Sequence, residues 1–276
     1  MNLKRKKYNI TRQVMDRTLN NILYETSEYE DYEAFVNAKD KIIGKAHNNK
    51  GIGTLSEKTL HAVLKLYYEP DEDKHEVAMS GYYADVYNDK GIIEIQTRQL
   101  NKLRDKLSVF LQDYHVTVVY PLPFNKWLSW VNPDNGEVQG RRKSPRHFTE
   151  YDAFYELYKI KSYLKNPNLS INLVLMDMEE YKLLNGWSYD KKRGSTRYDR
   201  VPVGIRRIVK FDRREDYMQL VPADLKEDFT VKDFAMAAGV SVEASRYTLN
   251  ILNYLEIVKR TGRVKNGYVY NVTEEF

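Results

Sequence analysis

The sequence contains no cysteine among its 276 residues. Disulfide bonds and thiolate metal sites are therefore excluded, and the composition fits a reducing cytoplasm, where we expect the protein to act. No run approaches the roughly 18 consecutive apolar residues that cross a bilayer. The basic start, residues 1–13, is not followed by the apolar core of a secretory signal. We therefore expect no membrane partner.

Several signatures of chemistry are missing as well. No two histidines have the spacing of zinc ligands. The "GIG" at residues 51–53 lacks the Gly-Lys-Ser/Thr ending that a nucleotide-binding phosphate loop requires, which argues against an ATP-driven motor. The sequence also shows no internal repeat and no low-complexity segment.

Positive charge, in contrast, is concentrated in two segments. Residues 187–214 hold ten Lys or Arg against three Asp, and "GRRKSPR" at residues 140–146 holds four with no acid. Such clusters form the electrostatic footprint for a phosphate backbone, and a pair of solvated loops is the alternative interpretation. The candidate nucleic-acid contacts in these segments are Arg141, Arg142, Lys143, Arg193, Arg197 and Arg200.

The length of the chain suits two domains with their own cores. Apolar residues at helical spacing predict an N-terminal helical segment over residues 1–50. Residues 54–121 read as helix, strand, strand, strand, helix and strand, and the second helix is a crossover that makes the sheet mixed. A less regular basic segment follows, with a hairpin, a helix and a further strand, so that the main domain spans residues 51–215.

One hairpin of this domain, "GYYADVYNDKGIIEIQT" at residues 81–97, carries polar residues among apolar ones. A two- or four-residue turn places Asp85 directly opposite Glu94, and Gln96 shares the face of Glu94. Opposed like charges with Cβ atoms about 5 Å apart are destabilising unless they are well solvated or a cation lies between them. Hard cations such as Mg²⁺ prefer such oxygen ligands, so Asp85 and Glu94 are predicted to bind Mg²⁺ or Mn²⁺.

The preceding helix offers a third carboxylate, Glu57, one turn before His61. Glu57 is a candidate catalytic residue if the helix aims it toward the sheet. The alternative is a capping box, because Thr54 and Glu57 have the spacing of one. We interpret His61 as a partly buried histidine.

The order of these elements and their polar residues resembles the PD-(D/E)XK nuclease superfamily, whose core is αβββαβ. The resemblance covers residues 54–121 and implies that Asp85 and Glu94 bind Mg²⁺. The third position, usually Lys in that superfamily, is Gln96 here, which matches its E-x-Q variant. Lys102 could supply the missing ammonium group, with a solvated surface lysine as the alternative.

The C-terminal segment, residues 216–276, reads as helix, turn, helix and two strands, with caps at Thr230 and Ser241. This pattern resembles a winged helix-turn-helix, in which the second helix is the recognition element. The resemblance implies nucleic-acid contacts, and packing against the catalytic domain is the alternative. The implied contact residues are Ser245, Arg246, Arg260, Arg263 and Lys265.

Together these patterns predict an α/β (α+β) protein with a mixed-sheet, restriction-endonuclease-like core and a smaller winged-helix domain. The predicted function is that of an Mg²⁺-dependent endodeoxyribonuclease, with the winged helix positioning DNA. The alternative is a DNA-binding regulatory protein whose nuclease-like fold is inactive. RNA as substrate and a homodimeric state both stay open.

Overall fold

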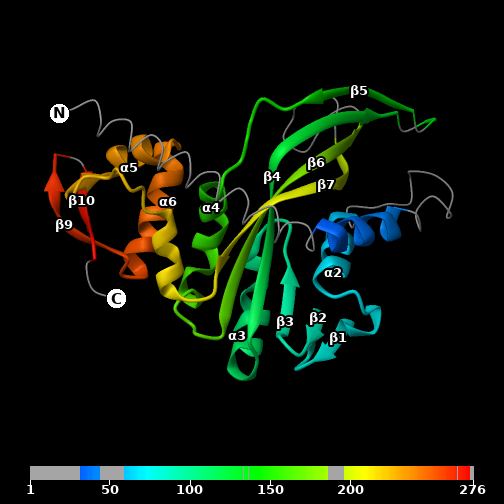
Figure 1. Cartoon of the computed structure of the whole chain (residues 1–276), viewed down its shortest axis with the longest axis horizontal. Coiled ribbons are helices and arrows are strands. Elements are labelled where there is room, and N and C mark those ends of the chain that lie inside the picture. Colours follow the sequence, from blue (N-terminus) through cyan, green and yellow to red (C-terminus); the bar gives the residue numbers. More distant parts are fainter. Residues whose placement is uncertain are drawn as a thin grey trace, which may run out of the picture.

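A mixed seven-stranded sheet runs through the middle of the molecule (Figure 1). The computed structural model describes residues 32–43, 59–132, 134–135, 137–185, 196–265 and 267–273. The strands are β1 (His75–Met79), β2 (Tyr82–Asn88), β3 (Gly91–Ile95), β4 (Val116–Val131), β5 (Val138–Lys143), β6 (Leu169–Leu183) and β7 (Thr196–Phe211). They lie in the order β1-β2-β3-β4-β6-β7, and β5 pairs with β4. The predicted mixed sheet is confirmed, because β4 is parallel to β3 and to β6 while the other pairs are antiparallel.

Helices cover both faces of this sheet and bury two separate apolar clusters. A helix over residues 32–43 and α2 (Thr59–Tyr68) contribute to one cluster, with Ile93 and Ile95 of β3 in the same cluster. Alternate strand residues such as Ile92 face the other cluster, where α3 (Arg104–Asp113) packs. The predicted order of helix, three strands, helix and strand is therefore present from α2 to β4. Within the described part of the chain, no helix is long and apolar enough to span a membrane.

The three predicted strands after α2 are present, and β1 and β2 are separate strands that break at Ser80–Gly81, because Ser80 and Gly81 both adopt positive φ. The predicted helix in the basic segment is shorter than expected. Residues 149–164 form one short helical turn, α4 (Phe154–Leu157), between the 3₁₀ segments η4 (Glu150–Ala153) and η5 (Tyr158–Tyr163).

The largest difference concerns the second basic segment. Residues 196–211 form strand β7, which pairs along almost its whole length with β6. The expectation of an irregular basic loop is therefore wrong for this part, and Arg197 and Arg200 lie on a strand. Val209 and Phe211 are buried with exposed Lys210 between them, which is the period of a half-exposed strand that the charge count concealed.

The C-terminal segment has the predicted helix, turn, helix and two strands, with one additional short strand. The elements are β8 (Phe229–Thr230), α5 (Val231–Ala238), α6 (Val242–Tyr254), β9 (Val258–Val264) and β10 (Gly267–Val272). Both predicted N-caps are confirmed: the Thr230 side chain accepts from the Asp233 N–H, and the Ser241 side chain accepts from the Ala244 N–H. The three strands form a second sheet in the order β8-β10-β9.

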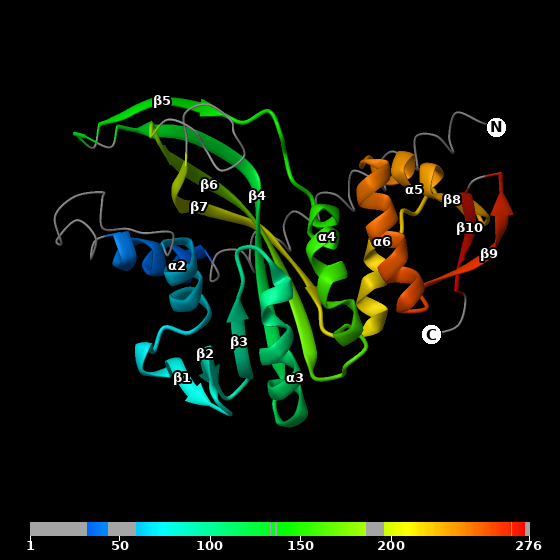
Figure 2. The ribbon, with the colours of Figure 1, turned by 180° about the vertical axis from the view of Figure 1, so that it is seen from behind.

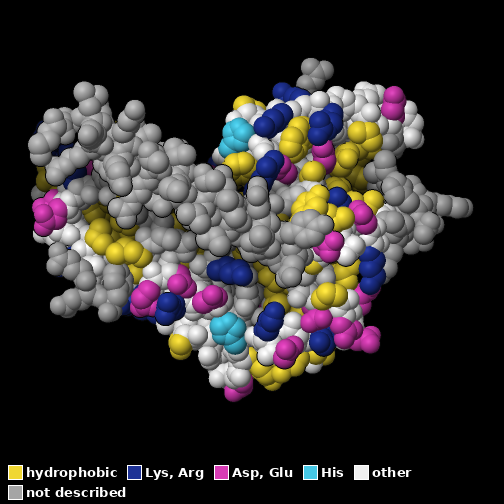
Figure 3. Space-filling view, viewed as in Figure 1, with side chains coloured by type: hydrophobic (Ala, Val, Ile, Leu, Met, Phe, Trp, Pro, Cys, Tyr) yellow, Lys and Arg dark blue, Asp and Glu magenta, His cyan; other side chains and the backbone are white. Residues whose placement is uncertain are grey.

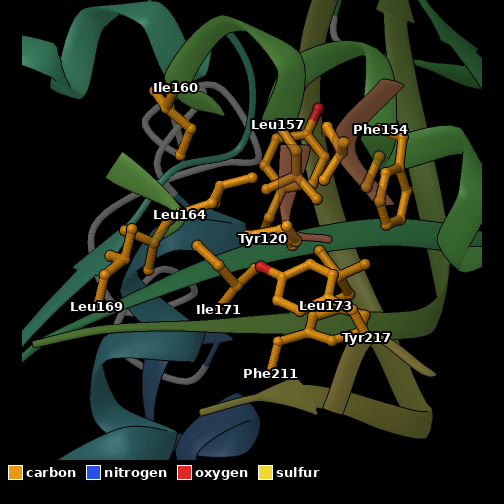
Figure 4. Packing of buried hydrophobic residues seen from close by; sticks show 14 of the residues in the cluster. Tyr120, Phe154, Leu157, Ile160, Leu164, Leu169, Ile171, Leu173, Phe211 and Tyr217 are labelled. Carbon is orange, nitrogen blue, oxygen red and sulfur yellow. The ribbon is translucent and has the colours of Figure 1, made fainter. Parts of the chain in front are cut away.

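The C-terminal elements share their apolar core with the main sheet. α4 lies between the sheet and α6 in both views (Figures 1 and 2). Leu157 and Ile160 of this region belong to the same buried cluster as Leu173 of β6 and Leu249 and Leu252 of α6. Figure 4 shows part of this cluster, where Leu157 and Phe154 lie across from Tyr120 and Tyr217. Buried apolar residues of α5, α6 and the small sheet therefore belong to the same cluster as those of the main sheet.

Gly91 is required where β2 turns into β3. Its φ is +103°, and a Cβ at this position would collide with the backbone carbonyl of His115. We expect Gly91→Ala to lower the free energy of unfolding by roughly 2–4 kcal/mol, because left-handed backbone and a backbone clash add. Denaturant unfolding measures this effect. Gly262→Ala is the matched control, since no atom lies within 4 Å of its added Cβ, and equal losses in both variants would contradict the prediction.

Candidate active site

The candidate site forms where β2 separates from β3. The ladder between the two strands ends at the pair Val86 and Ile93, and the next residues along it are Asp85 and Glu94. There the Ile95 N–H donates to Asp85 Oδ2 at 2.7 Å, and the Asp85 N–H faces Glu94 Oε1 at 3.4 Å. A side-chain carboxylate thus takes the place of a strand carbonyl. The predicted register, with Asp85 opposite Glu94, is confirmed.

Two cationic or ionisable side chains reach these carboxylates from opposite helices. Lys106 Nζ of α3 lies 3.0 Å from Glu94 Oε1 and 2.9 Å from Glu94 Oε2. His61 Nε2 of α2 lies 3.0 Å from Asp85 Oδ2. The pair of carboxylates is therefore held between the helices on the two faces of the sheet, and each carboxylate has its own nitrogen partner.

These four side chains line one open cleft with a volume of about 820 Å³. Gln96 and Lys102 line the same cleft, so the structure brings together four of the five predicted catalytic residues. The fifth, Glu57, lies outside the described residues. Lys102 is in the 3₁₀ turn η3 (Leu100–Leu103) at the rim, whereas Lys106 bonds Glu94. The lysine that bonds Glu94 in the structure thus lies one helical turn after Lys102.

Gln96 has a structural task in this cleft. Its side-chain NH₂ donates to the backbone carbonyls of Arg98 and Gln99, the latter at 3.3 Å. Gln99 adopts the left-handed conformation with φ 57°, so these bonds stabilise a strained turn between β3 and η3. Since this turn delays the start of α3 until Arg104, it also sets Lys106 beside Glu94.

The electrostatics of the two carboxylates diverge. Burial and the negative charge of Asp85 raise the pKa of Glu94 to about 7, although Lys106 opposes the shift. Burial also acts to raise the pKa of Asp85, but the hydrogen bond and charge of His61 and the N–H of Ile95 outweigh it, and the pKa falls below its usual range. Asp85 is therefore the ionised member of the pair, and Glu94 titrates near neutrality.

This shift predicts a pH-dependent stability. The folded pKa of Glu94, about 7, lies above its usual value of 4.5, so the bound proton stabilises the fold fully below about pH 4.5. That contribution is lost as the pH rises through about 7. Relative to Glu94→Gln, the wild type should therefore lose about 1–3 kcal/mol of unfolding free energy between pH 5 and pH 8 in chelator. Denaturant unfolding across this range measures it, and a constant difference between the two proteins would refute it.

The donor set fits a hard divalent cation. Asp85 and Glu94 present carboxylate oxygens to one cleft, and Lys106 is the cation that bonds Glu94. Mg²⁺ is commonly held by one or two carboxylates while water and substrate phosphate complete its shell. His61 would then orient Asp85 from outside the shell. In the part of the chain that the structure describes, no group of three or more His, Cys, Asp or Glu residues could hold a metal.

The predicted nucleic-acid contacts have mixed outcomes. Ser245 is fully buried and its hydroxyl donates to the Ser241 carbonyl, so the expectation that it is exposed is wrong. Arg193 lies outside the described residues. The other predicted contacts that are exposed on the surface are Arg141, Arg142, Lys143, Arg246, Arg260, Arg263 and Lys265.

These exposed residues form two aromatic and basic surfaces. On β5, the Arg141 and Arg142 guanidinium groups lie over the rings of Trp127 and Trp130, at 5.0 and 5.3 Å from the ring centroids. On β9, Arg260 and Arg263 flank the ring of Tyr268 at 4.2 and 4.7 Å. Lys and Arg side chains gather over β5 on the face that Figure 3 shows.

The second helix of the C-terminal unit does not present its whole length to solvent. Tyr247 of α6 packs edge-on against Tyr155 and Tyr158 at 5.2 and 5.5 Å. Lys161 Nζ donates to Asn250 Oδ1 at 2.9 Å. The main domain thus covers one side of α6. The hairpin β9–β10 is the more exposed part of the C-terminal unit.

Sequence reasoning missed Lys106 as a site residue and gave His61 only a structural role. A signal for both was present: His61 follows Glu57 by one turn, and Lys106 follows Lys102 by one turn on an amphipathic helix. The missing information was where α3 begins, which depends on the bonds of Gln96.

The fold and the cleft define an α/β protein with a mixed sheet and a carboxylate pair at a strand fork. The chain belongs to the family described as "Domain of unknown function (DUF8091)", whose model matches residues 58–212. It is also similar to an "Uncharacterized protein" of Treponema pallidum (strain Nichols), with 29% identity over 208 residues, which are 73% of this chain and 79% of that protein. No solved structure matches the chain. The family match begins just before α2 and ends just after β7, so it covers the cleft and the whole seven-stranded sheet.

Proposed function

We propose that the protein is an Mg²⁺- or Mn²⁺-dependent endonuclease that hydrolyses phosphodiester bonds of DNA. The observation that carries this proposal is the convergence of Asp85, Glu94 and Lys106 in one open cleft. Two carboxylates beside an ammonium group, at a fork between antiparallel strands, are the donor set that the resemblance to PD-(D/E)XK nucleases implies. The order of elements from α2 to β4 supports the same proposal.

In this proposal each side chain has a separate task. Asp85 and Glu94 hold the metal through carboxylate oxygens, and His61 keeps Asp85 ionised and oriented. The metal, when bound, supplies positive charge to a phosphoryl oxygen. Lys106 replaces the lysine that is absent at position 96 and donates toward the negative charge that develops on the phosphate.

Basic surfaces outside the cleft would bind the phosphate backbone. Arg142 and Lys143 on β5, and Arg260 and Arg263 on the hairpin β9–β10, lie exposed beside aromatic rings. Phosphate contacts of this kind set the register of a strand on the protein without reading its sequence. The C-terminal unit is thus proposed to position DNA through its hairpin.

One observation favours a second candidate function. Lys106 already bonds both oxygens of Glu94, so its ammonium group neutralises the charge that a metal would neutralise. A chain that uses this ion pair in place of a metal would be a DNA-binding regulatory protein with an inactive nuclease-like fold.

Cleavage assays separate the two candidates. Plasmid DNA, linear DNA and RNA are incubated with the full chain in Mg²⁺, in Mn²⁺ and in chelator. The endonuclease proposal expects nicking or linearisation of plasmid in metal and none in chelator. Lys106→Met should lower the rate by about 10²-fold, the size typical of one lost electrostatic donor. Binding of DNA without cleavage of any substrate in either metal would favour the regulatory protein.

A further inference from the structure

A second charged site surrounds Glu180, in the part of the sheet where β5 pairs with β4. Glu180 of β6 has a nearly buried side chain, only 4% exposed, and four cations approach its carboxylate within 4.0 Å. They are Lys126 of β4 at 3.4 Å, Lys182 of β6 at 3.9 Å, and Arg197 and Arg200 of β7 at 3.5 and 3.7 Å. We call these five residues the Glu180 cluster.

The positive charge of this cluster is in excess. One carboxylate faces four cations, and in the ion pairs of the described residues no second carboxylate joins them. Of the four cations, Lys126 is the one that donates a hydrogen bond to Glu180 within the described ranges. Arg197 Nε is buried and lacks a hydrogen-bond partner there. Hydrogen-bond donors that are buried without an acceptor lower the stability of the fold, and a bound ligand with acceptor atoms would remove this cost.

A neighbouring ion pair on the same two strands shows the balanced alternative. Asp177 of β6 is buried like Glu180, but it meets one cation, Arg206 of β7, through two hydrogen bonds of 3.0 and 2.6 Å. Asn125 donates to the same carboxylate at 2.9 Å. One carboxylate is paired with one guanidinium group, and both carboxylate oxygens of Asp177 accept hydrogen bonds. The excess at Glu180 is therefore a property of that position and not of β6 and β7 in general.

The cations of the cluster are partly exposed to solvent. The side chains of its four cations retain 16–33% of their exposure, whereas Glu180 retains 4%. Burial and the charge of Arg197 lower the pKa of Arg200 to about 10, and the charge of Arg98, a cleft residue, adds to this effect. Arg98, which lines the cleft with Lys102 and Lys106, is thus near enough to Arg200 for their charges to interact.

From this arrangement we infer that the Glu180 cluster binds a phosphate group of a nucleic-acid strand that extends from the cleft. A phosphodiester carries the missing negative charge and several acceptor oxygens, and two guanidinium groups suit its geometry. Four cations around one carboxylate favour the repeating charge of a phosphate backbone over an isolated carboxylate of an acidic peptide. The inference deepens the proposed function and rests on it for the choice of nucleic acid.

Charge-neutral variants test the inference by binding alone. Arg197→Gln removes one cation of the cluster, and Arg206→Gln, on the same strand, is the matched control because its charge is already balanced by Asp177. Binding of labelled single-stranded and duplex DNA is measured in chelator, over a range of salt. Arg197→Gln should weaken binding about tenfold and reduce the salt slope by roughly 0.7 on single strands or 0.9 on duplex, while Arg206→Gln stays within about twofold.

Thermal melting supplies a second readout that does not depend on DNA. At constant ionic strength, inorganic phosphate in place of chloride should raise the Tm of the wild type and not that of Arg197→Gln. Because the cluster is overcharged, Arg197→Gln in chloride should melt at or above the Tm of the wild type, which separates lost binding from lost folding.

Three results would overturn the inference. In the first, Arg197→Gln and Arg206→Gln weaken DNA binding equally. The cluster would then contribute only to the general positive potential of the surface and would not be a specific phosphate site. Stabilisation by phosphate that depends on Arg197 while DNA binding does not would assign the site to a free phosphate ligand. Polyglutamate that binds as tightly as DNA, through Arg197, would assign it to an acidic protein. All assays contain chelator, so their outcome is independent of whether the cleft cleaves.

Discussion

Asp85→Asn is expected to lower metal-dependent cleavage by about 10³-fold, because a carboxylate ligand worth several kcal/mol to the transition state is lost. The amide oxygen of the variant can still accept from the Ile95 N–H, so the fork between β2 and β3 should persist. DNA binding in chelator should stay within about twofold of the wild type, because the phosphate contacts lie elsewhere. Single-turnover cleavage and fluorescence anisotropy on the same protein preparations measure the two quantities.

Glu76→Gln is the matched control for this variant. Glu76 lines the same cleft and forms an ion pair with Lys65, so its substitution removes the same charge from the same region. Its cleavage rate should change by no more than about threefold, as for an exposed ion pair. If Asp85→Asn cuts as fast as Glu76→Gln, the cleft is not the active site, and the activity must be sought in another part of the chain.

The sequence was sufficient to predict the hairpin of β2 and β3 and the register of its two carboxylates, but not the fork between the strands. The period of two in residues 91–96 fixes which side chains share a face, and Gly91 fixes the turn that sets Asp85 against Glu94. The period of two and the turn glycine are both local features, so they can be interpreted without knowledge of the rest of the fold. The position of Lys106 is not local, because it depends on a left-handed residue, Gln99, held by side-chain bonds that no periodicity encodes.

The same contrast explains the error at β7. A segment with many Lys and Arg reads as solvated, yet residues 196–211 form one strand along β6, where Glu180 and Asp177 form ion pairs with Arg200 and Arg206. Long-range pairing of charges within a sheet is set by tertiary contacts and overrides composition. The count of basic residues therefore predicted the position of the positive charge correctly, but it did not predict that this segment forms a strand.

The chain shortened after Val221 is expected to be insoluble. The segment that is lost contains α5, α6 and the small sheet, and its removal uncovers Phe154, Leu157 and Ile160, each fully buried in the complete chain. Each such side chain contributes about 1.5–3 kcal/mol when buried, so the remaining part loses much of its stability and gains an apolar patch. The soluble fraction after expression and size-exclusion chromatography measure the outcome. A monomeric shortened chain with a cooperative melting transition would show that the main domain folds independently.

A point substitution tests the shared core without truncation. Leu252 of α6 is fully buried, and Leu252→Ala should lower the unfolding free energy by about 2–5 kcal/mol. Because its cluster includes residues of β6 as well as α6, the whole chain should still unfold in one transition, at a lower temperature, with equal calorimetric and van't Hoff enthalpies. Met236→Ala on α5 is the control, since Met236 is 80% exposed and its loss should leave the Tm unchanged. If Leu252→Ala instead splits the melting curve into two transitions, the C-terminal unit is a separate domain, as the sequence pattern predicts.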